Sequence, residues 1–173
     1  LTITTELEVN SGTTFTSTGN NITTPVVDNQ SGGTFTLGAG STLTFTDVSG
    51  CGFASSAGTF NSNGTSGSPN TVTSVASGIP THLWDFDTTM VVTADYTTFE
   101  KFSKFKTTAA INIDDCTFRD NATGDWIVEI AGAVTSFTDN TLTRTVAGTN
   151  SYALKSSTGH SAFDNIVISG AVG

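Results

Sequence analysis

The sequence predicts an all-β fold, and three observations point to it. β-branched and aromatic residues are abundant, with 12 Phe, whereas helix formers such as Met, Lys, Arg and Glu are scarce. No long window keeps apolar residues at helical spacing without Gly or β-branched interruption. Short apolar and polar alternations recur along the chain. With 36% hydrophobic residues in 173, one folded domain spanning residues 1–173 is expected.

The predicted strands are short and separated by turn residues. Residues 1–9 alternate apolar and polar side chains, with one slip at Thr4 and Thr5, as a half-buried strand does. Further strands are predicted at 33–37, 41–48, 58–61, 71–75, 90–92, 110–113, 126–130, 141–146 and 166–168. Gly, Asn, Asp or Ser clusters separate most of them, as expected for tight bends between strands.

Internal repeats indicate how these strands are arranged. Gly-Thr-Phe patterns recur at residues 12–15, 33–35 and 58–60, and later Phe residues follow at intervals of 19, 19 and 26 from Phe99 through Phe118 and Phe137 to Phe163. This period predicts a parallel β-helix (β-solenoid) with coils of roughly 19–26 residues, stacked about 4.8 Å apart. Phe columns would fill the interior and Asn ladders the bends. Residues 1–30 are expected to form a strand or cap region, and residues 31–173 the stacked coils.

The charge distribution excludes some functions. The net charge is −9, and no Lys or Arg precedes Lys101, so nucleic-acid binding is not expected. No apolar run approaches the roughly 18 residues that span a bilayer, which argues against membrane insertion. The acidic first hundred residues and the cluster of Lys101, Lys104 and Lys106 would guide association between copies, or they are simply solvated faces.

Cysteines and sequons favour an extracellular or cell-surface protein. The chain has Cys51, Cys116 and four candidate glycosylation sites, at Asn21, Asn29, Asn63 and Asn121. The 65 residues between the cysteines correspond to about three coils, on the order of 14 Å, whereas a disulfide needs Cα atoms within about 7 Å. Two alternatives remain, namely buried thiols or a disulfide from each cysteine to a neighbouring subunit.

A resemblance to a known family adds to this interpretation. Residues 58–69 and 71–74, together with the Phe-x-Asp-Asn type of coil near Phe118 and Phe137, resemble extracellular right-handed parallel β-helix repeat surface proteins of the pectate-lyase-like type. The resemblance covers residues 30–170, although the period is irregular between Phe60 and Phe99. It implies a surface-layer or adhesin module, or else a polysaccharide lyase or hydrolase.

Enzymes of that type need close carboxylates, often Ca²⁺, and a basic residue. Candidate carboxylates are Asp85 with Asp87, Asp114 with Asp115, and the set Asp120, Asp139 and Asp164, with Arg119 or Arg144 as the base. The set of three is expected to stack at one corner about 5 Å apart, either as a Ca²⁺ site or as solvated turn residues.

Catalysis lacks a clear starting point in this sequence. Neither arginine lies in a recognisable motif, and His82 and His160 have no metal-ligand spacing. No nucleophile, nucleotide or redox motif is present. The prediction is therefore that the protein is not an enzyme and carries no cofactor, with Ca²⁺ left open.

Thr-x-Thr triplets, such as residues 34–36, 42–44, 71–73 and 141–143, leave a second surface function open. Stacked outward threonines can present a regular array of hydroxyl and methyl groups to ice. The simpler interpretation is a solvated sheet face, because Thr is a strong strand former.

The two ends of the predicted stack favour self-assembly. Neither end shows a helical or charged cap, so both are expected to pair with other copies, or else with neighbouring parts of a longer surface protein from which these residues come. The assembly residues are expected to be Leu1, Ile3, Leu7, Val9, Ile166, Val167 and Ile168. The expected function is a structural subunit of a cell-surface filament, sheath or layer. A carbohydrate-binding adhesin or polysaccharide-acting enzyme is the alternative, and exposed Trp84, Tyr96, Trp126 and Tyr152 would favour glycans as partners.

Overall fold

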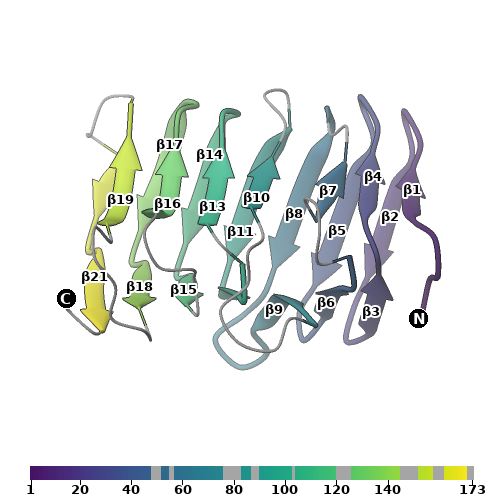
Figure 1. Cartoon of the computed structure of the whole chain (residues 1–173), viewed down its shortest axis with the longest axis horizontal. Helices are drawn as coiled ribbons and strands as arrows, with labels where there is room; N and C mark the ends of the chain where they lie inside the picture. Colours follow the sequence, from purple (N-terminus) through teal and green to yellow (C-terminus); the bar gives the residue numbers. More distant parts are fainter. Residues whose placement is uncertain are drawn as a thin grey trace.

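The chain forms a parallel β-helix, as predicted. The computed structural model describes residues 1–47, 52–54, 57–75, 83–86, 90–102, 104–119, 126–144, 152–157 and 162–170. In these ranges there are 21 short strands, and every pair of neighbouring strands is parallel. Each coil contributes one strand to each of three faces, and the coils stack along the longest axis with the two termini at opposite ends (Figure 1). Within these ranges we find no helix long and apolar enough to cross a membrane.

Two faces are long sheets of seven strands. Sheet I consists of β2 (Thr14–Ser17), β5 (Thr34–Gly38), β8 (Thr59–Asn63), β11 (Val91–Asp95), β14 (Ile111–Asp114), β17 (Val134–Thr138) and β20 (Phe163–Asp164). Sheet II consists of β3 (Asn21–Thr24), β6 (Thr42–Phe45), β9 (Asn70–Ser74), β12 (Thr97–Glu100), β15 (Thr117–Arg119), β18 (Thr141–Arg144) and β21 (Val167–Gly170).

The third face is divided into two sheets. The first contains β1 (Leu7–Val9), β4 (Val27–Asn29) and β7 (Phe53–Ala54). The second contains β10 (Leu83–Phe86), β13 (Lys104–Thr107), β16 (Trp126–Ile130) and β19 (Tyr152–Ser156). Strands β7 and β10 contact each other, so the two sheets follow one another along the stack.

Alternation of side chains explains why these segments form strands. In β5, Phe35 and Leu37 point inward and are buried, whereas Thr34 and Thr36 are half-buried on the outer surface. The same pattern makes continuous columns inside the stack, because equivalent residues of successive coils are in register. The inner column of sheet II is Ile22, Leu43, Val72, Phe99, Phe118, Leu142 and Ile168.

Aromatic side chains fill the interior in two clusters. In the first, Phe35 stacks between Phe15 and Phe60, with ring centroids 5.4 and 5.8 Å away, and Phe53 of the third face meets Phe35 edge-on. This confirms the Gly-Thr-Phe repeat as one column of sheet I. In the second cluster, Phe118 stacks on Phe99 at 5.1 Å. Edge and stacked contacts of this kind contribute beyond simple area burial.

The predicted period was only partly correct. Phe118 lies in sheet II and pairs with Leu142, whereas Phe137 lies in sheet I and pairs with Phe163, so the 19 residues between Phe118 and Phe137 are not one coil. Coils also exceed the predicted 26 residues, since Phe60 is opposite Val92. The period misled because strands of both sheet I and sheet II carry an inward Phe.

Most of the variation in coil length occurs at one corner. Connections from sheet I to sheet II have one to three residues, apart from residues 64–69, where Thr65 and Ser68 form a bridge. From sheet II to the third face, the connections include residues 46–52, 75–82, 120–125 and 145–151. The strand register is therefore kept while the coil length changes.

Residues 1–30, predicted to form a strand or cap region, contribute strands to the stack. Strands β1, β2 and β3 make a complete coil in register with the next one. Before this coil, Thr2 pairs in parallel with Thr23 of β3, so residues 1–3 add a partial strand to sheet II.

Candidate functional site

The corner between sheets I and II is built from residues with positive φ. Tyr96, Asp115, Asp139 and Asn165 occupy equivalent places in successive coils, with φ between 42° and 55°. This left-handed conformation is uncommon outside glycine, and Asp and Asn tolerate it best. A single such residue turns the chain sharply enough to join the two sheets.

Buried amides hold this corner together from one coil to the next. The Asn140 side chain accepts a hydrogen bond from the Cys116 amide at 2.9 Å and donates one to the Ile113 carbonyl at 2.8 Å. Asn70 does the same for Ser41 and Leu37, at 2.9 and 3.1 Å. The predicted Asn ladder therefore exists in another form, in which asparagines bond to the backbone of the preceding coil.

Acidic residues gather on the outside of the same corner. We call Asp95, Asp114, Asp115, Asp139 and Asp164 the acidic corner. Asp95 and Asp114 are opposite each other in sheet I. Partial burial, together with the nearby charges of Asp114 and Asp115, raises the pKa of Asp95. The negative charge of Asp115 also raises the pKa of Tyr96, whose side chain is exposed.

The Asp114 side chain is already bonded within the protein, and the Asp139 backbone connects two coils. The Asp114 carboxylate accepts hydrogen bonds from the Ser136 hydroxyl at 2.5 Å and from the Thr138 amide at 3.0 Å. The Asp139 amide donates to the Asp164 carbonyl at 3.1 Å. Both arrangements stabilise the stack of coils without any ligand.

The predicted calcium set does not form the expected column. Asp164 is opposite Thr138, while Asp139 occupies the turn position whose equivalent in the next coil is Asn165. Asp120 lies outside the described residues. Among the residues that the structure describes, no group of three or more His, Cys, Asp or Glu side chains is arranged to hold a metal ion.

The predicted catalytic candidates are not brought together in the described part of the chain. Asp85 is opposite Lys106 in the third face, and Asp87, His82 and His160 lie outside the described residues. Arg119 forms an ion pair with Glu100 at 2.6 Å in sheet II. The side chains of Arg144, Trp84, Trp126 and Tyr152 are also outside the description, so of the four predicted aromatic contact residues only Tyr96 is placed.

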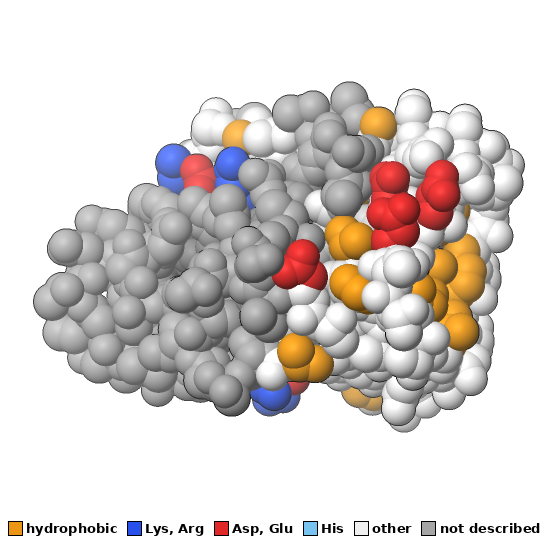
Figure 2. Space-filling view, turned by 45° about the vertical axis from the view of Figure 1, so that its right-hand side comes forward, with side chains coloured by type: hydrophobic (Ala, Val, Ile, Leu, Met, Phe, Trp, Pro, Cys, Tyr) orange, Lys and Arg blue, Asp and Glu red, His pale blue; other side chains and the backbone are white. Residues whose placement is uncertain are grey.

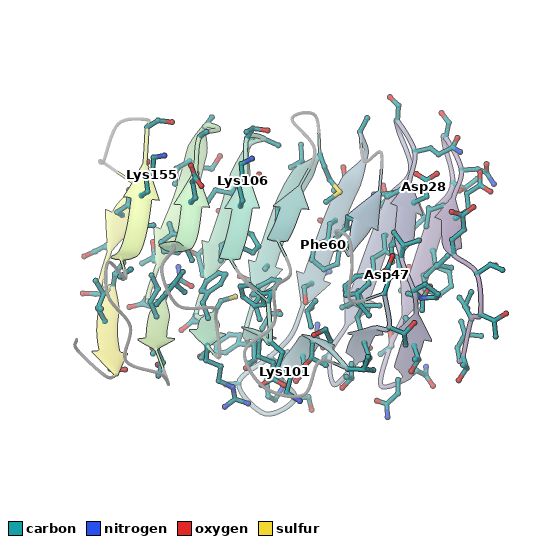
Figure 3. The ribbon with its side chains drawn as sticks, in the orientation of Figure 1. Asp28, Asp47, Phe60, Lys101, Lys106 and Lys155 are labelled. Atoms are coloured by element: carbon teal, nitrogen blue, oxygen red, sulfur yellow. The ribbon has the colours of Figure 1, made fainter. Side chains whose placement is uncertain are left out.

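In most strands of the third face, one charged side chain points outward, and the residues before and after it point inward. Lys106 is opposite Glu129, and Glu129 is opposite Lys155, with an ion pair of 2.8 Å between the last two. Nearer the N-terminus, Glu8 is opposite Asp28. We call this row the charged ladder. Asp28, Lys106 and Lys155 lie along one line across the stack (Figure 3).

The two ends of the stack differ from its middle in exposure. All four residues of β21 are exposed, with Val167 and Ile168 at 56% and 62%. At the other end, Leu1 is 64% exposed, whereas Leu7 and Val9 are buried. Figure 2 brings this end forward and shows hydrophobic side chains beside acidic ones. Of the predicted assembly residues, Leu1, Val167 and Ile168 are thus accessible, Ile3 and Ile166 are half-buried, and Leu7 and Val9 belong to the core.

Cys116 and Asn29 are buried, which bears on two further predictions. Cys116 is 1% exposed, its thiol donates to the Asp114 carbonyl at 3.2 Å, and burial raises its pKa. This fits the buried-thiol alternative, and a disulfide to a neighbouring subunit would require the corner to open. Asn29 is fully buried and donates to the Thr59 carbonyl, so a glycan there is incompatible with this packing.

The other cysteine and the other predicted glycosylation sites are either exposed or outside the described residues. Asn21 and Asn63 are exposed and stay candidates for glycosylation. Cys51 and Asn121 lie outside the described residues.

Outward threonines form a column on sheet II. Thr42, Thr71, Thr98, Thr117 and Thr141 are opposite one another in five successive coils. The varying coil length does not disturb this column, because the register between the strands of sheet II is kept. A second column, Thr23, Thr44 and Thr73, is followed by the paired Glu100 and Arg119.

Comparisons with known proteins gave no match. No protein-family model matches the sequence, and no curated protein or solved structure shows significant similarity to it. The β-solenoid architecture therefore stands on the structure itself.

Sequence reasoning did not predict that Asp95 and Tyr96 lie at the acidic corner, and it did not predict the charged ladder. The interval of 19 residues from Phe99 to Phe118 also separates Asp95 from Asp114 and Tyr96 from Asp115. Applying that interval to the acids would have placed them together. The charged ladder gives no comparable signal, because its residues are 23 and 26 positions apart across undescribed connections.

Proposed function

We propose that this protein is a self-assembling structural subunit of an extracellular filament, sheath or layer. The observation that carries the proposal is the exposed strand β21, whose two large apolar side chains lie at the end of a parallel stack. Its outer edge has no strand partner among the described residues. An exposed apolar edge strand with unpaired backbone groups is a template for pairing with another chain.

Three further features support association over turnover. The described interior is filled by hydrophobic columns, which suits a rigid rod. At the acidic corner, the Asp114 carboxylate is bonded within the protein, and Asp115, Asp139 and Asp164 are exposed. Hydroxyl-rich outer faces and exposed sequons at Asn21 and Asn63 suit an extracellular setting. We also propose that the chain belongs with the extracellular pectate-lyase-like β-helix surface proteins, a proposal that its parallel β-helix supports.

Solution mass tests the proposal directly. Light scattering over a range of concentrations is expected to show large species that grow with concentration. A constant mass of 17.8 kDa at every concentration would overturn self-assembly and direct attention to glycan binding. The same measurement with reductant, on the wild type and on Cys51→Ser, tests whether Cys51 joins subunits, because Cys116 is buried.

A second candidate function rests on the threonine columns of sheet II. A flat array of hydroxyl and methyl groups, repeated about every 4.8 Å along the stack, suits adsorption to ice. Inhibition of ice recrystallisation by the wild type and its loss in Thr71→Lys would support this function. The matched change Thr59→Lys on sheet I should have no effect, and an inactive wild type rules the function out.

A further inference from the structure

The two ends of the stack are not directly complementary, because sheet II has an additional partial strand, residues 1–3, beyond β3. The first complete coil runs through β1, β2 and β3, and the last through β19, β20 and β21. Residues 1–3 precede the first coil and occupy the outer edge of β3. The described chain therefore makes seven full coils and one additional partial strand.

All neighbouring strands are parallel, so a second copy can continue the helix only in one sense. Strand β19 of one copy would lie on β1 of the next, β20 on β2, and β21 on β3. All three pairs can form at the same time only if residues 1–3 leave the edge of β3. Otherwise β21 would lie on residues 1–3 and the other two faces would be separated by one missing strand.

We propose that copies of this chain join head to tail by strand replacement, in which β21 of one copy takes the place of residues 1–3 on β3 of the next. Residues 1–3 then act as a removable cap on the growing end. This inference rests on the proposed self-assembly and names the joint that performs it. The occupant of the β3 edge is a second copy of the chain.

Core packing supports this joint. The Thr2–Thr23 bridge places Leu1 opposite Ile22, which begins the inner column of sheet II. Ile168 ends the same column and is 62% exposed. In the joint, Ile168 would take the position of Leu1 on Ile22, so the exposed Ile168 side chain would be buried and the apolar column would continue from one copy into the next.

Charge complementarity supports it as well. Along the charged ladder, positive Lys106, negative Glu129 and positive Lys155 alternate toward the end formed by β19. Glu8 holds the outward position of β1 at the opposite end. The joint would place Lys155 beside Glu8 of the next copy, which continues the alternation. Opposite charges directly across neighbouring strands are favourable, and like charges are not.

The cap is held by few interactions. The Ile3 amide donates to the Thr23 carbonyl at 2.8 Å, the Thr23 amide to the Leu1 carbonyl at 2.9 Å, and the terminal amine to the Asn21 carbonyl at 2.8 Å. Strand β21 offers four residues to the same edge, as it does to β18 on its other side. Replacement thus exchanges a one-bridge contact for a full strand pair.

Charge reversal tests the joint without relying on a truncated chain. Glu8→Lys and Lys155→Glu each place like charges at the joint when the variant is alone, and opposite charges when the two variants are mixed. We expect each variant alone to assemble at least about tenfold more slowly in light scattering, and the mixture to recover most of the wild-type rate. Lys101→Glu changes the net charge by the same amount on an interior coil and should assemble like the wild type.

Deletion of residues 1–3 tests the cap. The shortened chain should assemble faster and at lower concentration than the wild type, because the β3 edge is already open. If the wild type assembles but neither the deletion nor the charge reversals change its rate, this joint is wrong and the proposed function stands. If neither the wild type nor the deletion variant assembles at any concentration, the proposed function itself fails.

Discussion

Single side-chain amides at the corner of sheets I and II connect coils that are far apart in sequence. Asn140 is fully buried and satisfies one backbone donor and one backbone acceptor of the preceding coil. A residue without that amide would leave both groups unpaired in the interior. Such a loss is costly because a buried polar group without a partner keeps its full desolvation penalty.

We therefore expect Asn140→Ala to lower the free energy of unfolding by about 2–4 kcal/mol. The matched control is Asn63→Ala, since Asn63 is exposed at the end of β8, and it should change stability by less than about 0.5 kcal/mol. Urea denaturation of both variants measures the difference. Equal stability of the two variants would show that the Asn140 bonds contribute little.

The acidic corner makes stability depend on pH in a defined direction. Partial burial first, and then Asp114 and Asp115, raise the pKa of Asp95 above its usual 3.8. The folded state thus holds this proton more tightly than the unfolded state. Folding is favoured by this group at low pH, and the contribution is lost as pH rises from 3.8 through the raised pKa.

Asp95→Asn should consequently raise the urea midpoint at pH 7, and the gain should disappear below about pH 3.5. Glu6→Gln removes one exposed acid away from this corner and serves as the control. A gain for Asp95→Asn that grows as the pH falls would contradict the assigned cause.

At the scale of the strand, stability depends on where in the stack an aromatic residue lies. Phe118 in β15 is fully buried, stacks on Phe99 and meets Phe105 edge-on at 5.1 Å. Phe163 in β20 is half-buried on the last described coil and contacts Phe137. The same substitution should therefore have different costs at the two positions.

We expect Phe118→Ala to destabilise the protein by about 3–5 kcal/mol, and Phe163→Ala by only about 1 kcal/mol, since much less apolar area is removed. Both are measured by urea denaturation monitored by circular dichroism. Similar losses at both positions would mean that the last coil is as well packed as the middle of the stack.

Strands were easier to predict from the sequence than their assignment to faces. The Gly-Thr-Phe repeat located β2, β5 and β8 correctly, because an inward Phe and outward threonines leave one workable orientation. The later Phe residues misled, because Phe118 and Phe137 are both inward but belong to different sheets. Local pattern determines which side of a strand is buried, but the length of the connections decides which face the strand joins.

At the scale of the whole molecule, the stack should open from its ends. Coils of a solenoid contact only their neighbours, so a terminal coil is stabilised on one side and interior coils on both. Strand β21 is exposed along its length, whereas the inner residues of β12 and β15 are buried. Local opening then needs less free energy at the end of the stack.

Hydrogen exchange measured by mass spectrometry should show β19, β20 and β21 exchanging first and β11 to β15 last. Dilute protein provides the unassembled reference. Uniform protection across all coils at low concentration would contradict opening from the ends and indicate a single cooperative unit.

Surface properties were the least predictable from sequence. The acids of the corner come from four different coils, and Asp95 meets Asp114 only because the register between β11 and β14 brings the two residues opposite each other. Likewise, the burial of Cys116 at the corner and of Asn29 at the end of β4 could not be predicted from their positions in the sequence. Composition correctly indicated an acidic, hydroxyl-rich exterior, whereas the grouping of charges required the register.

The length of the connections varies mainly at the corner between sheet II and the third face. Extra residues can therefore be accommodated at this corner without a change in the stacked strands. Residues 46–52, 75–82, 120–125 and 145–151 all connect the same two faces, on different coils. Segments inserted there would project from one edge of the rod without shifting the register of any strand. The molecule is thus suited to carry a row of grafted peptides or tags. The coil repeat would set the distances between them, so the molecule could serve as a scaffold for multivalent display.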